Sequence, residues 1–208
     1  ILDQEKSLAV FDINPEATKS LAEKQARILP SPKAVADEAE VVFACMPTME
    51  SFHAVVTGTN GVLGGEAMKT FVNLGTMGTE AVAEVEADLA AKGIAMLDSP
   101  ITGGVQRAWA GDITVVSSGP QAIFDQVEPL LQSFARDIHY VGPEIGQAQL
   151  VKIANNIMSF TNLVIACEAL VMVAKGGVDP EKALGVMNSG SGQNSATLSK
   201  VPNFVLNR

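Results

Sequence analysis

Residues 70–100, TFVNLGTMGTEAVAEVEADLAAKGIAMLDSP, decide the fold. An apolar run over 70–74 is followed by a helical pattern over 79–92 and by a second apolar run over 94–97. Short apolar runs separated by one helix of this length are typical of parallel strands joined by a crossover helix. This stretch therefore predicts an α/β fold built on a parallel sheet.

The same alternation extends in both directions. Further apolar runs lie at 8–13, 41–46, 113–117 and 138–141, and helical patterns lie at 15–26, 33–39, 48–56 and 120–135. We therefore predict a Rossmann-like, doubly wound parallel sheet over residues 1–145, with helices on both faces. Only 11 residues precede Asp12, so the glycine fingerprint of such folds does not fit before it, and we expect a sheet that is incomplete at its N-terminus.

The pattern changes after Gly142-Pro143. Residues 146–175 contain no Pro and no internal Gly, which predicts one long helix that ends at Gly176-Gly177. Asp179-Pro180 then supplies the N-cap and first position of another helix. We predict an all-helical domain over 146–208, truncated because the chain stops inside an apolar stretch.

The long helix is nearly continuously apolar from Ile157 to Ala174, which raises the question of a membrane span. Asn162 and Glu168 lie within it, and such polar groups are costly in lipid. We therefore predict a buried helix of a soluble protein and no membrane partner. A long apolar helix also favours association into a homo-oligomer.

Composition narrows the function classes. Hydrophobic residues make up 47% and charged residues 18%, which excludes global disorder. A net charge of 14 − 23 = −9 and only 5% aromatic residues argue against a nucleic-acid partner. Cys45 and Cys167 lie in separate apolar stretches, so we predict buried free thiols and a reducing, cytoplasmic location. His53 and His139, without a Cys cluster, predict no metal site.

Three positions after apolar runs are candidates for cofactor binding. An acid at the end of the second strand of a dinucleotide-binding fold accepts hydrogen bonds from the adenosine ribose, and Asp12 occupies such a position. Met46-Pro47 and Gly75-Thr76 each follow a predicted parallel strand, where these sheets bind ligands. Ordinary turns are the alternative at each position.

The segment Asp98-Ser99-Pro100-Ile101-Thr102-Gly103-Gly104 is more distinctive. A strand end, a proline and two glycines give a stiff turn with free backbone N–H groups beside the Thr102 hydroxyl. This arrangement suits a small carboxylate. The alternative is a tight loop that needs positive φ at its glycines.

Lys152, Asn155 and Asn156 form the strongest constellation. Lys152 and Asn156 are four residues apart and share one face of an otherwise apolar helix. Burial lowers the pKa of a lysine and lets it exchange a proton near neutral pH. The alternative is a lysine whose ammonium reaches water beside a structural amide network.

In this order, the pieces resemble the β-hydroxyacid dehydrogenase family. The resembling residues are Val10 to Pro15, Met46-Pro47, Asp98 to Gly104, Gly146-Gln147 through Lys152 to Asn155-Asn156, and Asn188 to Gly192. The match covers nearly the whole chain. The family usually has Ser where this chain has Thr102, which keeps the hydroxyl but adds a methyl group.

The resemblance implies a role for each site residue. Lys152 would be the catalytic acid/base, and Asn155 and Asn156 would hold the substrate. The implied carboxylate site and cofactor site are the following: Thr102, Gly103 and Gly104 for the carboxylate; Asp12, Met46, Pro47 and Thr76 for the cofactor.

The implied reaction transfers a hydride between NAD and a small 3-hydroxy acid such as 3-hydroxyisobutyrate. We predict NAD rather than NADP because Asp12 would repel a 2′-phosphate. Asn155-Asn156 argues against 6-phosphogluconate dehydrogenase, which has His-Asn there, and Lys152 argues against imine reductases. A tartronate semialdehyde reductase and a non-catalytic binding or assembly module remain open.

Overall fold

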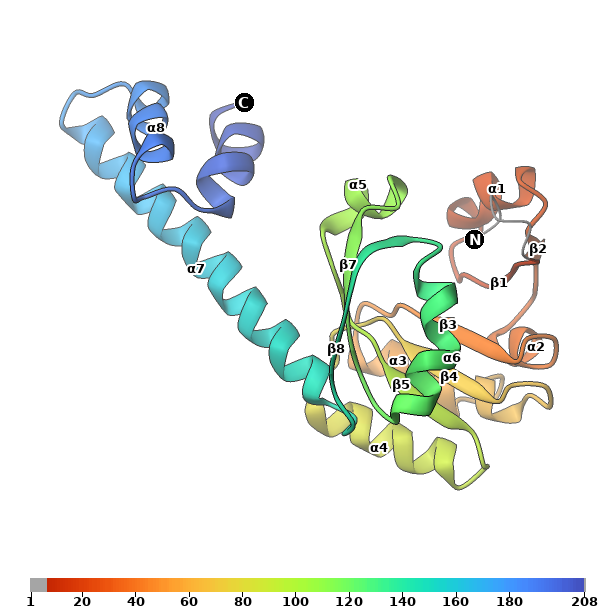
Figure 1. The fold of residues 1–208 in the computed structure, drawn as a ribbon. Coiled ribbons are helices and arrows are strands. Elements are labelled where there is room, and N and C mark those ends of the chain that lie inside the picture. Colours follow the sequence, from red (N-terminus) through yellow and green to blue (C-terminus); the bar gives the residue numbers. More distant parts are fainter. Residues whose placement is uncertain (1–6, 208) are drawn as a thin grey trace. The chain divides into compact units, whose positions relative to one another are not determined.

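The computed structural model describes residues 7–207 (Figure 1). Its contacts divide the chain into two compact units, Ile1–Lys152 and Ile153–Arg208. Helix α7 (Gln147–Lys175) runs from the first unit into the second. The division predicted at residues 145 and 146 remains a proposal.

The first unit alternates strands and helices. Its strands are β1 (Ala9–Val10), β2 (Arg27–Ile28), β3 (Val41–Ala44), β4 (Thr70–Asn73), β5 (Ala95–Asp98), β6 (Ile101–Thr102), β7 (Ile113–Ser118) and β8 (Ala135–Gly142). Its helices are α1 (Pro15–Glu23), α2 (Pro32–Ala36), α3 (Met49–Thr57), the 3₁₀ helix η2 (Val62–Gly64), α4 (Thr79–Ala90), α5 (Gly104–Trp109) and α6 (Gln121–Leu131).

The main sheet has the order β3-β4-β5-β7-β6, with β8 paired to β7. Strands β3, β4 and β5 are parallel, and so are β7 and β8, which confirms the predicted α/β class. One departure is that β7 runs antiparallel to β5 and to β6. Strand β6 turns back onto β7 after Pro100, so β5 and β7 meet only where both end, at Asp98 and Ser118.

Both faces of the sheet are covered, as a doubly wound fold requires (Figure 1). Neighbouring strand residues point to opposite faces. Phe71 of β4 packs in a core with Phe52 of α3 and Val85 of α4. Val72, the next residue, packs in a second core with Phe124 of α6.

Several helix boundaries follow from local capping residues. The Asn14 side chain accepts a hydrogen bond from Glu16 N at 3.1 Å and Asp179 caps Glu181 N at 2.8 Å, each with a proline at the first helical position. Gly177 has φ +81° just beyond α7. These three predicted boundaries are confirmed.

Other predicted boundaries are wrong. The run at 8–13 forms only the two-residue β1, which pairs with β2 apart from the main sheet. The helix predicted over 120–135 ends at Leu131, and β8 begins at Ala135 instead of 138. Parallel pairing along β7 decides this, because it draws Ala135 and Asp137 into the ladder.

The second unit is helical, as predicted. It contains most of α7, α8 (Pro180–Ser189) and two π-helical segments, η3 (Ala196–Lys200) and η4 (Pro202–Leu206). Its core brings together α7, α8 and the π-helical segments and consists of Ala166, Leu170, Ala183, Leu184, Ala196 and Val201.

The predicted burial of α7 is wrong for the described residues. The helix is long and apolar enough to span a membrane by length and composition, and only 11% of its most apolar window is buried. Within its own unit the other elements contact one side of it, around Ala166 and Leu170. Many of its other apolar side chains, such as Phe160 and Met172, are exposed.

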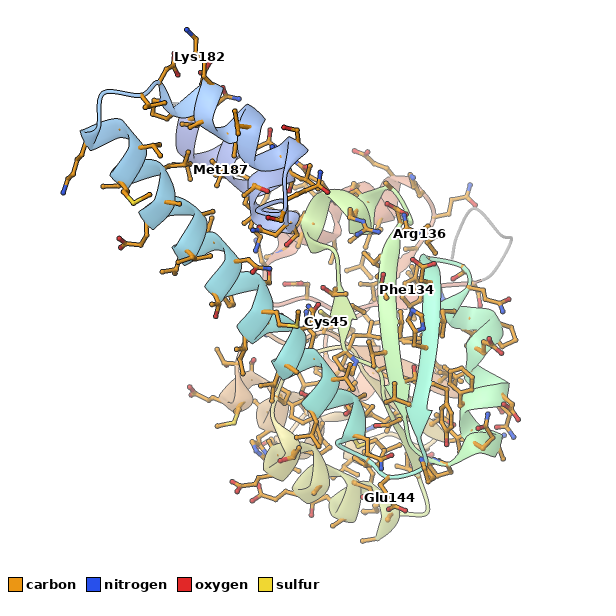
Figure 2. All side chains as sticks on the ribbon, turned by 60° about the vertical axis from the view of Figure 1, so that its left-hand side comes forward. Cys45, Phe134, Arg136, Glu144, Lys182 and Met187 are labelled. Atoms are coloured by element: carbon orange, nitrogen blue, oxygen red, sulfur yellow. The ribbon has the colours of Figure 1, made fainter. Side chains whose placement is uncertain are left out.

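The two cysteines are free thiols, but their predicted burial is also wrong. Cys45, labelled in Figure 2, is exposed because it lies just beyond the last residue of β3, where the chain leaves the sheet. Cys167, on α7, is half-buried.

Candidate active site

The ends of β3, β4 and β5 bring together segments that are far apart in sequence. These neighbouring strands are parallel, so the segments that follow them lie at one edge of the sheet. A Cβ built on Gly75 would lie 3.1 Å from Met46 O and 2.5 Å from Met77 Cε. The structure thus packs the Met46 loop directly against the Gly75–Thr76 loop, with Met46 half-buried and Thr76 exposed.

A buried cluster of polar side chains lies beneath the loop of residues 75–78. Asn73 Nδ2 donates to Asp98 Oδ1 at 2.9 Å and to Gly75 O at 3.0 Å. Asn73 Oδ1 accepts from Gly75 N at 2.9 Å. Both Asn73 and Asp98 have no exposed surface. The ends of β4 and β5 are therefore joined to each other and to the loop.

Gln149, in the first turn of α7, completes this cluster. Its Oε1 accepts from Met77 N at 2.8 Å and from Gly78 N at 3.1 Å. Its Nε2 donates to Asp98 Oδ1 at 2.7 Å and to Gly75 O at 3.1 Å. We call the side chains of Asn73, Asp98 and Gln149, with the backbone of residues 75–78, the Asp98 junction.

The start of α7 is further held by β7. Ala148 N, one of the first helical N–H groups, donates to Ser118 Oγ at 3.0 Å. Gln147 Oε1 accepts from Glu144 N at 3.2 Å. Figure 2 shows Glu144 at the end of β8 where α7 begins, away from Arg136 near the strand's start. These hydrogen bonds hold the first turn of α7 against the end of the sheet.

Asp98 is an ionisable group in this buried place. Burial raises the pKa of its carboxyl to about 6. The amides of Asn73 and Gln149 and the backbone N–H groups of Gly146 and Gln149 oppose this pKa rise by favouring the carboxylate. Oδ2 is buried without a hydrogen-bond partner. At neutral pH the junction therefore contains a largely ionised carboxylate.

Lys152 lies three residues beyond Gln149 on α7, so the two side chains occupy neighbouring positions on one side of the helix. Lys152 is half-buried, and this burial lowers its pKa. Asn156 is half-buried one turn further along the same helix, and Asn155 is exposed. The predicted lysine is therefore on a helix whose start is fixed to the loop of Thr76.

The Thr102 turn is open to solvent. Thr102 is half-buried in β6, where it pairs with Thr114 of β7. Gly103 and Gly104 have φ of +135° and +78°, and a Cβ on Gly104 would meet nothing within 4 Å. Both glycines thus have the backbone conformation of a tight loop, but only Gly104 has open space beside it, since a Cβ on Gly103 would lie 3.3 Å from Arg107 Cβ.

Asp12 lies just after β1 and is exposed. Its Oδ1 accepts from Asn14 N at 2.8 Å, immediately before α1. A cavity of about 290 Å³ is lined by both Phe11 and Met46. The cavity is therefore lined by the neighbour of Asp12 and by Met46, whereas Asp12 and Pro47 are not among its lining residues.

The segment from Asn188 to Gly192, one of those that resemble the family, belongs to the second unit, and its first residue lies in the last turn of α8. Asn188 Nδ2 donates to Thr197 O at 3.1 Å, and Gln193 Nε2 donates to Asn188 O at 2.9 Å. Asn194 Oδ1 accepts from Ala196 N at 2.9 Å. The end of α8 and the loop after it are thus held together by hydrogen bonds within the second unit.

Sequence reasoning missed Asn73, Ser118 and Gln149. Each is fully buried, and each is a polar residue within or beside an apolar run. That signal was available in the sequence, since a buried polar side chain needs a partner. The identity of the partners was not, because they come from three separate segments.

Two family models match the chain. The NAD binding domain of 6-phosphogluconate dehydrogenase matches residues 1–142. The NAD-binding domain of NADP-dependent 3-hydroxyisobutyrate dehydrogenase matches residues 146–208. Together they cover both units.

Individual proteins give the same result. The 3-hydroxyisobutyrate dehydrogenase of Pseudomonas aeruginosa is 33% identical over 188 residues, which are 90% of this chain and 63% of that protein. The 2-(hydroxymethyl)glutarate dehydrogenase of Eubacterium barkeri is 27% identical over 99% of this chain and 68% of its own length. The chain thus spans about two thirds of these relatives.

A solved structure, that of Psf3 in complex with NADP⁺ and 2-OPP, is 27% identical and superposes with a TM-score of 0.85 over 94% of this chain and 69% of that one. The fold, the family models and the relatives agree. On these grounds the chain belongs to the β-hydroxyacid dehydrogenases, the family that shares its NAD-binding domain with 6-phosphogluconate dehydrogenase.

Proposed function

We propose that this chain forms the cofactor site and part of the substrate site of an NAD-dependent dehydrogenase of small 3-hydroxy acids such as 3-hydroxyisobutyrate. The observation that carries the proposal is Lys152, a half-buried lysine with a lowered pKa on the helix that Gln149 anchors beside Thr76. A lowered pKa makes the neutral amine, which can accept a proton, easier to form.

The residues at the strand ends suit a nicotinamide dinucleotide. The exposed Asp12 carboxylate is able to accept hydrogen bonds from ribose hydroxyls, and Asn14 N already orients one of its oxygens. Met46 offers an apolar contact, with Pro47 beside it, and Thr76 presents an exposed hydroxyl. These four residues would hold the cofactor, which when bound accepts or donates the hydride.

Each substrate-side residue has a separate task in this proposal. Backbone N–H groups of Gly103 and Gly104 and the Thr102 hydroxyl bind the substrate carboxylate. Lys152 Nζ takes the proton from the substrate hydroxyl during oxidation and returns it during reduction. Asn155 and Asn156 hold the substrate near the lysine through their carboxamides.

We further propose NAD as the preferred cofactor. A carboxylate at position 12 would face the 2′-phosphate of NADP at close range, and Ile13, Asn14 and Pro15 offer no cation there. Psf3 was solved in complex with NADP⁺, and one of the matching family models is described as that of an NADP-dependent enzyme, so the preference has to be measured with both cofactors.

The exposed and polar residues of α7 also bear on the location and the assembly of the protein. Asn162 and Glu168 would be costly in lipid, which supports a soluble protein. The free thiols of Cys45 and Cys167 support a reducing, cytoplasmic location. We also propose a homo-oligomer in which a second copy covers the exposed side of α7. The exposed apolar side chains of α7 support such a homo-oligomer.

The test is an assay of the full-length protein with a panel of 3-hydroxy acids and their semialdehydes, using NAD and NADP in turn. We expect turnover with at least one 3-hydroxy acid and higher kcat/KM with NAD. Turnover of tartronate semialdehyde alone would instead identify a tartronate semialdehyde reductase. Cofactor binding without turnover of any member would favour a binding module.

A further inference from the structure

We propose that Gln149 is a positioning residue, whose buried carboxamide sets the position of Lys152 relative to the loop of Thr76. This inference rests on the proposed role of Lys152. It concerns only residues 73–152, all within the first compact unit.

The geometry of Gln149 is unusual because every polar atom of its side chain is used twice. Oε1 accepts from two consecutive backbone N–H groups, Met77 and Gly78, at 2.8 and 3.1 Å. Nε2 donates to Gly75 O and to Asp98 Oδ1 at 3.1 and 2.7 Å. The side chain has no exposed surface, so no water competes for these four bonds.

These bonds connect the three elements that a hydride-transfer site has to align. The loop of residues 75–78 carries Thr76, β5 leads into the Thr102 turn, and α7 carries Lys152. Lys152 is less than one helical turn beyond Gln149, so a shift or rotation of this first turn moves Lys152 with it.

Asp98 and Asn73 determine which way round the carboxamide of Gln149 lies. Asp98 Oδ1 accepts from both Asn73 Nδ2 and Gln149 Nε2, so it requires donor groups at both positions. The carboxamide of Gln149 can then turn only its oxygen toward Met77 and Gly78. The buried carboxylate therefore fixes the orientation of the glutamine.

The first experiment compares Gln149→Ala with Gln147→Ala in the full-length protein. Gln147 lies in the same helical turn, but its Oε1 accepts from the exposed Glu144 N and takes no part in the Asp98 junction. We expect Gln149→Ala to lower kcat by about 10–100-fold, with KM changed less than about threefold, because small misplacements of a reacting group cost this much. We expect Gln147→Ala to stay within about threefold of the parent in kcat.

A second readout does not depend on turnover. In Gln149→Ala the amide protons of Met77 and Gly78 lose their acceptor, so we expect their native-state hydrogen exchange to accelerate at least about tenfold. The strand amides of Val72 and Leu97 should keep their protection, which shows that the sheet is still folded.

Two further variants separate hydrogen bonding from packing. Gln149→Met keeps the approximate size of the side chain but loses all four hydrogen bonds, so kcat should fall by about 10–100-fold, as in Gln149→Ala. Gln149→Glu keeps the acceptor for Met77 and Gly78 but places a carboxylate against Asp98 Oδ1 and Gly75 O, and should lower kcat at least as much.

The outcomes separate the two proposals. If Lys152→Ala abolishes turnover but Gln149→Ala leaves kcat unchanged, the positioning role is overturned and the proposed function stands. If Lys152→Ala leaves turnover intact, both are overturned. If Gln149→Ala is too unstable to assay, Gln149→Met takes its place: an unchanged kcat in that variant overturns the positioning role, and a loss of about 10–100-fold in kcat with little change in KM supports it.

Discussion

The Asp98 junction and the Thr102 turn, which follows β5, both belong to the site that we propose, and they are built in opposite ways. At the junction, Asn73, Asp98 and Gln149 are fully buried and bind one another and the backbone. At the turn, Gly103 and Gly104 are exposed and have positive φ. The turn's shape comes from local backbone freedom, whereas the junction's shape comes from contacts across the fold.

The two regions therefore hold their geometry by different means. A buried amide network restrains a neighbouring helix because breaking any of its bonds leaves an unsatisfied polar group. An exposed glycine turn leaves backbone N–H groups accessible to an incoming anion. We therefore expect changes at the junction to alter both kcat and stability, and changes at the exposed residues to alter binding alone.

The largest expected effect is at the lysine that the junction supports. Lys152→Ala should reduce turnover by about 10²–10⁴-fold, the usual contribution of a positioned acid or base. The measurement is steady-state kcat in the full-length protein, with Lys175→Ala at the end of the same helix as the control. Near-normal turnover of Lys152→Ala at neutral pH would show that Lys152 is not the acid/base, and the junction that holds its helix would then have no role in catalysis through it.

The next effect concerns stability and pH at Asp98. Its pKa is raised by burial from 3.8 in the unfolded chain to about 6, so the folded protein holds this proton more tightly. Stability from this group is therefore fully present below about pH 4 and is lost as pH rises through about 6, a change of about 3 kcal/mol.

In Asp98→Asn this pH-dependent contribution should be absent, because the asparagine does not ionise. Urea unfolding at pH 4, 5, 6 and 7 on both proteins gives the difference in unfolding free energy at each pH. If the unfolding free energies of the two proteins changed with pH in the same way, Asp98 would not be a buried carboxyl group with a raised pKa.

A smaller effect is expected at Asp12, on the exposed side of the comparison. We expect kcat/KM with NAD to exceed that with NADP by about tenfold, from repulsion between the 2′-phosphate and the Asp12 carboxylate. Asp12→Ser/Ile13→Arg should remove or reverse this preference without changing the melting temperature.

The matched control for this pair is Glu16→Ser, which removes a carboxylate four residues away on α1 that pairs with Lys19. It should leave the cofactor preference unchanged. Better use of NADP than of NAD by the parent enzyme would show that Asp12 does not face the ribose.

The smallest effect is expected at the turn itself. Thr102→Ala should raise KM about fivefold for a carboxylate substrate and less for its uncharged amide, since one hydroxyl donor to an anion is lost. Thr114→Ala, at the paired position on β7, is the control and should leave both KM values unchanged. Equal effects of Thr102→Ala on both substrates would assign the turn a structural role.

Much of the fold could be predicted because local patterns carry it. The apolar runs at 41–46 and 70–74 contain β3 and β4, and those at 94–97 and 113–117 match β5 and β7 to within one residue at each end. Each run is bounded by its own turn residues. The run at 8–13 was overestimated because strand length depends on a partner, and β1 pairs over two residues with β2. The direction of β7, which is antiparallel to β5, likewise depends on strand pairing and could not be predicted from local patterns.

By itself, the sequence determined the α/β class, the long helix, the caps at Asn14 and Asp179 and the positive φ of Gly103 and Gly104. All of these depend on residues close together in the chain. Only the tertiary structure decided that Asn73, Asp98 and Gln149 meet, because hydrogen bonds across 25 to 74 positions exist only once β4, β5 and α7 are packed. The lysine could thus be found in the sequence, whereas the residue that holds its helix in place could be found only in the fold.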